Sequence, residues 1–121
     1  MSKQGWIGVD LDGTLASYDN WKGVGHVGAP LMPMVNRVKQ WLEEGVEVRI
    51  MTARAWSDGS VGRNLEVAVN TEAIQAWCKE HIGVVLPVTC TKDYFMVELW
   101  DDRAVRVDRN TGEPCAGCKG H

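Results

Sequence analysis

No stretch of this sequence is apolar for long enough to span a bilayer, and the first residues, MSKQGW, lack the apolar segment of a signal peptide. An excess of positive charge is also missing, because 13 basic side chains stand against 16 acidic ones and give a net charge of −3. This balance argues against a general nucleic-acid-binding surface, while a local basic patch stays open. We expect a cytoplasmic protein with no membrane partner.

The sequence lacks the cysteine spacing of small disulfide-rich secreted proteins. The four cysteines are Cys78, Cys90, Cys115 and Cys118. Cys115 and Cys118 together with His121 could bind Zn²⁺, but a structural zinc site normally has four protein ligands. We therefore prefer a flexible tail over residues 109–121 to a metal-bound one.

The chain is short, and its 121 residues suit one domain and leave no room for two. Its hydrophobic content of 45% is that of an ordinary globular protein and is enough to fill a core. We expect a single domain over residues 1–108, followed by the tail.

The stretch from Gly5 to Leu15, GWIGVDLDGTL, places two carboxylates directly after a short apolar run. Residues 5–9 predict a buried strand, because they favour β structure and turn-forming residues follow them. Asp10 and Asp12 stand at the end of this strand, where like charges disfavour joint ionisation. Such a pair is typical of a cation site or a reaction centre. An Asp-rich turn without a function is the simpler alternative.

Helical and strand patterns alternate along the rest of the chain. Apolar residues at helical spacing predict helices within 30–45 and 65–82, the second burying Val69, Ala73, Ala76 and Trp77. Apolar runs predict strands at 46–51, 84–88 and 95–100 and a short last strand at 105–107. Segments rich in turn formers predict loops at 16–30 and 55–64.

This order of elements is typical of an α/β fold. We expect a Rossmann-like three-layer sandwich with a mainly parallel sheet, and right-handed crossovers that put helices on both faces. Ligands of such sheets bind outside the carboxyl ends of the strands. The polar side chains that should meet there are Asp10, Asp12, Thr52, Asp101 and Asp102.

Carboxylates grouped with a hydroxyl and with cations suit a divalent metal ion and a phosphate. Mg²⁺ prefers oxygen ligands and is typically held by one or two carboxylates and by substrate phosphate. A carboxylate can also attack phosphorus and form an aspartyl-phosphate, while a second carboxyl protonates the leaving alcohol. Thr52 and Arg54 follow the second strand and suit an oxyanion, and Lys92 adds a charge that can neutralise it.

Four short segments, in this order, resemble the four motifs of the haloacid dehalogenase-like (HAD-like) superfamily of phosphohydrolases. They are DLDGTL at 10–15, MTAR at 51–54, Lys92, and WDD at 100–102, within a match that spans roughly residues 6–107. Each segment lies at an expected strand end or in the loop that follows. The resemblance implies a HAD-like phosphatase domain over residues 1–108. It favours phosphate release over C–halogen cleavage, because the dehalogenase branch has no acid at the position of Asp12.

The resemblance also implies catalytic roles. Asp10 matches the nucleophile, and Asp12 matches the general acid/base. Thr52 matches the hydroxyl that binds phosphoryl oxygens, and Lys92 matches the lysine that steadies Asp10 and the transferring phosphate.

Metal and substrate ligands follow from the same resemblance. The implied cofactor is Mg²⁺, held by Asp10 and Asp101, with Asp102 in the same shell and the backbone carbonyl of Asp12 as a further contact. The implied substrate-binding residues are Thr52, Ala53, Arg54 and Lys92.

The spacers between the first three motifs are too short for the cap domain that many relatives use to enclose small substrates. Capless relatives include heptose-bisphosphate phosphatases and the phosphatase domain of polynucleotide kinase. These act on larger or extended substrates or use a partner subunit as a lid. The substrate therefore stays open among a nucleotide, a sugar phosphate and a polynucleotide end, and the choice between monomer and homodimer stays open as well.

The residues that would select the substrate lie in the two loops. Trp21, Trp56, Arg54 and Arg63 could form a rim that stacks on a base, grips a sugar or closes a dimer. Lys22 and His26 could reach a ligand from the loop at 16–30, although a solvated loop is the simpler interpretation of that segment.

Two functions without catalysis are the alternatives. A receiver-like signalling module also gathers acids and a lysine on an α/β sheet. It needs a phosphoacceptor Asp at the end of the third strand, where this chain has Pro87, Val88 and Thr89. A catalytically silent HAD-like protein that only binds a partner is the other alternative, although every catalytic position of the family is filled here.

Overall fold

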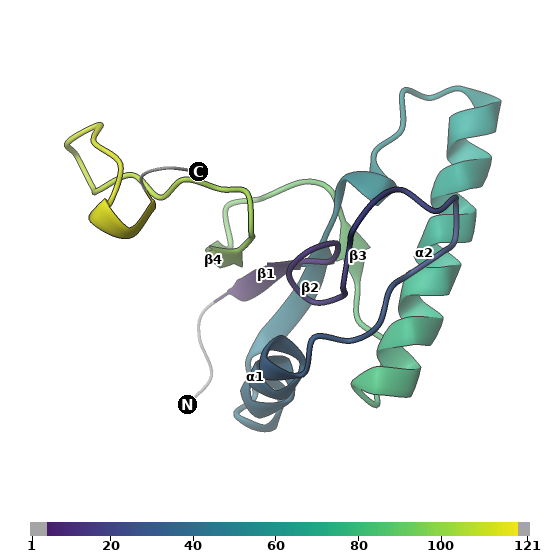
Figure 1. Ribbon diagram of the computed structural model, residues 1–121, viewed down its shortest axis with the longest axis horizontal. Coiled ribbons are helices and arrows are strands. Elements are labelled where there is room, and N and C mark those ends of the chain that lie inside the picture. Colours follow the sequence, from purple (N-terminus) through teal and green to yellow (C-terminus); the bar gives the residue numbers. More distant parts are fainter. Residues whose placement is uncertain (1–4, 119–121) are drawn as a thin grey trace.

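The computed structural model describes residues 5–118, which form one parallel sheet with two helices. The strands are β1 (Trp6–Asp10), β2 (Glu47–Met51), β3 (Val88–Thr89) and β4 (Met96–Trp100). Their order in the sheet is β3-β2-β1-β4, so the first strand in the sequence lies inside the sheet and the last at an edge (Figure 1). The α/β class and the Rossmann-like parallel sheet are confirmed.

Both helices pack on the same face of this sheet. The crossovers from β1 to β2 through α1 (Met32–Glu43) and from β2 to β3 through α2 (Val61–His81) step in the same direction across the sheet. Right-handed crossovers that step in one direction place their helices on one face. A single core cluster accordingly joins strand residues Ile7, Val9, Val48 and Ile50 to helix residues Val35, Val38, Ile74 and Trp77.

The opposite face of the sheet is covered by side chains and by a loop. Trp6 lies there and is fully buried, because the Arg49 guanidinium stacks 4.5 Å from its ring and Asp93 accepts a 2.8 Å hydrogen bond from its indole. Leu99 of β4 lies on the same face and is 39% exposed. Within residues 5–118 no helix lies on this face, so the third layer of the expected sandwich is not formed there.

Helix α1 follows its sequence pattern closely. Pro33 occupies its first turn, where a missing N–H costs nothing, and its apolar stripe buries Met34, Val35 and Val38. The helix ends before Gly45, whose φ of 80° suits the left-handed C-terminal position.

Helix α2 differs from its prediction in both its start and its buried face. It begins at Val61, because the Ser60 hydroxyl accepts a 3.2 Å hydrogen bond from the Arg63 N–H, so the loop before it is shorter than 55–64. Its buried face is formed by Asn70, Ile74, Trp77 and Cys78. Of the predicted face, Trp77 is buried as expected, whereas Val69 is half exposed and Ala76 is exposed, so the prediction is wrong for these two residues. The physical reason is that Asn70 is a polar residue on the core side, and a hydrophobicity pattern places such a residue in solvent.

The third strand and the C-terminal segment also differ from expectation. β3 has only two residues, since Val84 and Val85 are exposed and Pro87 precedes the strand. The predicted strand at 105–107 is reduced to one isolated bridge, between Val107 and Pro114. Residues 104–118 project away from the sheet (Figure 1) and end in a short 3₁₀ turn, η2 (Ala116–Cys118). The zinc prediction is not tested, because His121 and the Cys118 side chain lie outside the described residues.

Candidate metal and phosphate site

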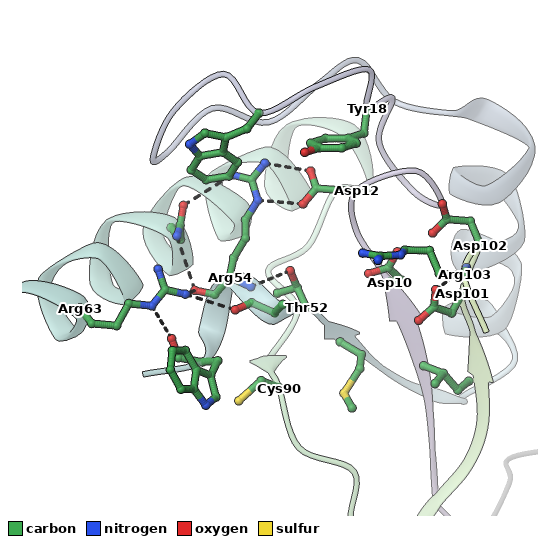
Figure 2. A pocket seen from close by; sticks show the side chains of 16 residues that line it. Asp10, Asp12, Tyr18, Thr52, Arg54, Arg63, Cys90, Asp101, Asp102 and Arg103 are labelled. Carbon is green, nitrogen blue, oxygen red and sulfur yellow. Dashed lines mark hydrogen bonds and ion pairs between the residues drawn. The ribbon is translucent and has the colours of Figure 1, made fainter. Parts of the chain in front are cut away.

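Three aspartates gather at the carboxyl ends of neighbouring strands. Asp10 ends β1, and Asp101 and Asp102 follow β4, which runs parallel beside β1. One carboxylate oxygen from each of the three lies within 4.8 Å of the others (Figure 2). Carboxylate oxygens at this spacing can bind a divalent cation together.

Burial and the neighbouring acids shift the pKa of Asp10. Burial, the hydrogen bond with Asp102, and the charges of Asp101 and Asp102 together raise the pKa of Asp10 to about 7, while a hydrogen bond from Thr14 opposes the shift. The acids therefore disfavour the fully ionised state unless a cation compensates their charge. A donor set of three hard oxygen ligands fits Mg²⁺.

The turn after β1 contacts Asp102 through Gly13 and Thr14. The Thr14 hydroxyl lies 3.3 Å from a carboxylate oxygen of Asp10 and 3.3 Å from one of Asp102, and it accepts a 3.0 Å hydrogen bond from the Asp102 N–H. Gly13 has a φ of 88°, and a Cβ at this position would stand 2.5 Å from Asp102 Oδ2. The Gly-Thr pair thus allows the two loops to approach each other and places Asp102 beside Asp10.

Asp12 points away from the other acids and pairs with Arg54 (Figure 2). The arginine Nε donates to Asp12 Oδ2 and its Nη2 donates to Asp12 Oδ1, each over 2.8 Å. Arg54 is only 7% exposed and lies in η1 (Ala53–Ala55), the 3₁₀ turn that directly follows β2. The pair joins the segment after β1 to the segment after β2.

Several groups hold Arg54 in this position. Its backbone N–H donates to the Thr52 hydroxyl over 3.2 Å, and Thr52 itself is buried. Its Nη1 lies 3.5 Å from Asn70 Oδ1, which also accepts a 3.0 Å hydrogen bond from the Gly25 N–H. The Trp21 ring lies against its guanidinium, 4.9 Å away. Asn70 therefore ties the loop at 16–30 and Arg54 to helix α2.

A cavity of about 740 Å³ collects most of the predicted site residues. Its lining includes Asp10, Asp12, Thr52, Ala53, Arg54, Asp101 and Asp102. The predicted rim residues Trp21, Trp56 and Arg63 line it as well. Lys22 and His26 lie instead along a neighbouring cavity of about 240 Å³, which shares Asp12 and Arg54 with the first.

Lys92 is a predicted catalytic residue that does not line the cavity with the aspartates. It is exposed, and it is not among the described residues that line the large cavity. Arg103, which follows the two strand-end aspartates, does line it. The adjacency of an arginine to an acidic pair was visible in the sequence, whereas only its place in the fold brings it to the cavity.

Sequence reasoning also missed Tyr18 and Asn70, both of which line the cavity. Tyr18 lies in a loop without periodicity, where no pattern singles it out. Asn70 is 1% exposed and sits on helix α2 four residues before the buried Ile74. A polar residue at helical spacing from core residues is the signal that could have identified it.

Comparisons with known proteins support the fold. The chain is similar to a solved structure of a conserved protein from Bacteroides thetaiotaomicron, with a TM-score of 0.55 and 18% sequence identity, over 85% of this chain and 79% of that one. At this identity the likeness shows the fold alone. Neither the protein-family profiles nor the curated protein sequences compared with the chain give a match. None of the helices within residues 5–118 is long and apolar enough to cross a membrane.

Proposed function

We propose that this protein is a Mg²⁺-dependent phosphatase of the HAD-like type, which hydrolyses phosphomonoesters through an aspartyl-phosphate on Asp10. The observation that carries the proposal is the cluster of Asp10, Asp101 and Asp102 at adjacent strand ends, in a cavity that also holds Thr52. The motif resemblance supports it, because these are the positions that match the nucleophile, the metal ligands and the phosphate-binding hydroxyl.

The three clustered aspartates would hold the metal ion. Their donor atoms are hard oxygens, and burial together with the neighbouring acids raises the pKa of Asp10, so a bound cation would stabilise its ionised form. A bound Mg²⁺ would neutralise charge on the phosphoryl oxygens and on the acids.

In the proposed reaction, a carboxylate oxygen of Asp10 attacks phosphorus and the bond from phosphorus to the ester oxygen breaks. Asp12 gives a proton to the departing oxygen and then takes one from the water that cleaves the aspartyl-phosphate. The products are the free alcohol, inorganic phosphate and the original Asp10 carboxylate. The Thr52 hydroxyl would bind phosphoryl oxygens during both steps.

Asp12 needs one change in its contacts for this role. Both of its oxygens accept hydrogen bonds from Arg54, so a proton on one oxygen requires Arg54 to give up one of the two contacts. The Asp12 side chain is 22% exposed, which leaves it accessible to a leaving group in the cavity. Arg54 acts in this scheme as a positioning residue for Asp12.

Two cationic side chains are candidates for stabilising the phosphoryl group. The resemblance assigns this role to Lys92, which follows β3 in an exposed segment, while Arg103 lines the cavity with the acids. Substituting each by alanine separates them, because the residue that binds the phosphoryl group in the transition state lowers kcat when it is removed.

The deciding experiment measures hydrolysis of p-nitrophenyl phosphate with Mg²⁺ and with a chelator. We expect turnover that requires the metal and is abolished in Asp10→Asn. A matched control is Asp108→Asn, which removes a carboxylate outside the cavity and should leave turnover unchanged. A wild type that hydrolyses neither this ester nor a broad panel of phosphate esters would instead support the alternative of a silent HAD-like or receiver-like binding module. Activity that survives in Asp10→Asn would disprove the mechanism.

A further inference from the structure

The two most exposed tryptophans of the chain both line the large cavity. All six tryptophans lie within the described residues, and Trp6, Trp41, Trp77 and Trp100 are buried or partly buried. Trp21 and Trp56 are 53% and 55% exposed, and both line the cavity together with the half-exposed Tyr18. Large aromatic rings left open inside a cavity are characteristic of a ligand-binding site rather than of core packing.

Arginines that are themselves anchored flank these two rings. The Arg54 guanidinium lies 4.9 Å from the Trp21 ring, and Asp12 and Asn70 hold Arg54. The Arg63 guanidinium lies 5.9 Å from the Trp56 ring, and Arg63 donates to the Trp56 carbonyl over 2.6 Å. Each cation–π contact therefore restrains an aromatic ring before any ligand binds. A preorganised ring loses little freedom when a planar group stacks on it.

The chemistry around the rings favours a base over a sugar. Sugar hydroxyls need many free hydrogen-bonding side chains, but Arg54 and Arg63 already bond to groups of the protein. Met51, Cys90 and Leu99, which also line the cavity, are apolar or weakly polar, while the clustered aspartates, Thr52 and Arg103 belong to the proposed phosphate site. A volume of about 740 Å³ is also larger than a phosphoryl group alone requires.

We infer that the cavity binds the phosphate ester of a nucleoside, with its base stacked on Trp21 or Trp56 and its phosphate at the aspartate cluster. This inference rests on the proposed function for the position of the phosphate, while the base site stands on the aromatic lining. The same chemistry is present in a free nucleotide and in the phosphorylated end of a polynucleotide. The ligands of the test distinguish these two sources.

The test compares ligands that differ only in the base. Adenosine 5′-monophosphate and ribose 5-phosphate share the sugar and the phosphate, and calorimetry on Asp10→Asn with Mg²⁺ measures both without turnover. We expect the nucleotide to bind at least about tenfold more tightly, because stacking of one base on an aromatic ring supplies an affinity gain of this order. A 5′-phosphorylated dinucleotide added to the series shows whether a polynucleotide end binds more tightly than the mononucleotide.

Substitution of one ring assigns the preference to the cavity. Trp21→Leu and Trp56→Leu are compared, and the substitution of the ring that stacks on the base should remove most of the advantage of the nucleotide and leave ribose 5-phosphate binding unchanged. An advantage that survives in both variants overturns the inference. Tyr94→Leu is the matched control, because Tyr94 is 93% exposed and does not line the cavity. If either tryptophan variant fails to fold, the ligand comparison on the unsubstituted rings still decides the inference.

The outcomes keep this inference separate from the proposed function. Equal affinity for the nucleotide and ribose 5-phosphate overturns the inference, whether or not p-nitrophenyl phosphate is hydrolysed. Adenosine that quenches tryptophan fluorescence in the wild type but not in one of Trp21→Leu and Trp56→Leu supports the base site, even where no phosphate ester is turned over. Quenching by adenosine without turnover of any phosphate ester would disprove the proposed phosphatase activity and support the base site.

Discussion

Arg54 and Asp12 form a two-point ion pair in which each of two guanidinium nitrogens lies 2.8 Å from a different carboxylate oxygen. The residues are 42 positions apart in the sequence and belong to the segments that follow β1 and β2. A planar guanidinium that meets a carboxylate at two points fixes the orientation of both groups. The pair thus sets the direction in which Asp12 faces the cavity.

Loss of Arg54 should lower both stability and turnover. Arg54→Ala leaves a partly buried carboxylate without its partner, which costs about 3 kcal/mol of unfolding free energy, and Arg54→Lys should recover part of it. We expect kcat for p-nitrophenyl phosphate to fall by about tenfold or more in Arg54→Ala while KM changes less, because in the proposed mechanism the chemical step depends on where Asp12 points. Chemical denaturation and steady-state kinetics measure the two effects.

Arg109→Ala, in the exposed C-terminal segment, is the control. A kcat that rises in Arg54→Ala would mean that the pair restrains Asp12 rather than positions it.

Mg²⁺ should stabilise the protein more as the pH rises. The folded-state pKa of Asp10 is raised from 3.8 to about 7, so the folded protein holds a proton there that the unfolded chain has lost. Without metal, the contribution of Asp10 to stability is therefore present below about pH 4 and is lost as the pH rises through about 7. Protons compete with the metal in the same window. The increase in melting temperature caused by Mg²⁺ should be larger at about pH 8 than at about pH 6.

Melting curves with Mg²⁺ and with a chelator at both pH values measure this difference, and Asp10→Asn should remove most of its pH dependence. An equal metal-induced shift at the two pH values would rule out Asp10 as a ligand.

Alanine at Gly13 should weaken metal binding, and alanine at Gly59 should not. The two glycines have nearly the same φ, 88° and 89°, so alanine costs about 1 kcal/mol of backbone strain at either position. A Cβ at Gly13 would also stand 2.5 Å from Asp102 Oδ2, whereas one at Gly59 meets no atom within 4 Å. Titration of each variant with Mg²⁺ by calorimetry separates strain from displacement of Asp102. Equal Mg²⁺ affinity in the two variants would contradict the inference that a side chain at Gly13 displaces Asp102.

Asn70→Leu should destabilise the protein although it adds apolar volume to a buried helix face. The change removes the acceptor of the Gly25 N–H and of an Arg54 N–H, and an unpaired buried polar group costs about 1–3 kcal/mol. Glu72→Leu, an exposed position of the same helix, should change stability by less than about 0.5 kcal/mol. Denaturation curves measure both, and the amide of Gly25 should exchange its hydrogen faster in Asn70→Leu. A stability gain in Asn70→Leu would show that its amide is not needed.

The local pattern of the sequence determined much of the fold. The apolar run before Asp10 and the stripe of Met34, Val35 and Val38 predicted β1 and α1 correctly, because period and capping residues act within one element. The acids at strand ends were also predictable, since the carboxyl ends of parallel strands meet at one edge of the sheet. Asp10, Asp101 and Asp102 lie together there.

Tertiary structure decided what depends on contacts between distant segments. The pairing of Asp12 with Arg54 and the burial of Asn70 are long-range choices, in which a partner far along the chain offsets the cost of burying a polar group. The one-sided placement of the helices came from the strand order β3-β2-β1-β4, which no periodicity encodes. The position of Arg103 in the cavity, and of Lys92 outside it, likewise follows from how the segments after β3 and β4 run in space. The sequence by itself determined which side chains stand at the strand ends, and the packing of the chain decided which of them meet.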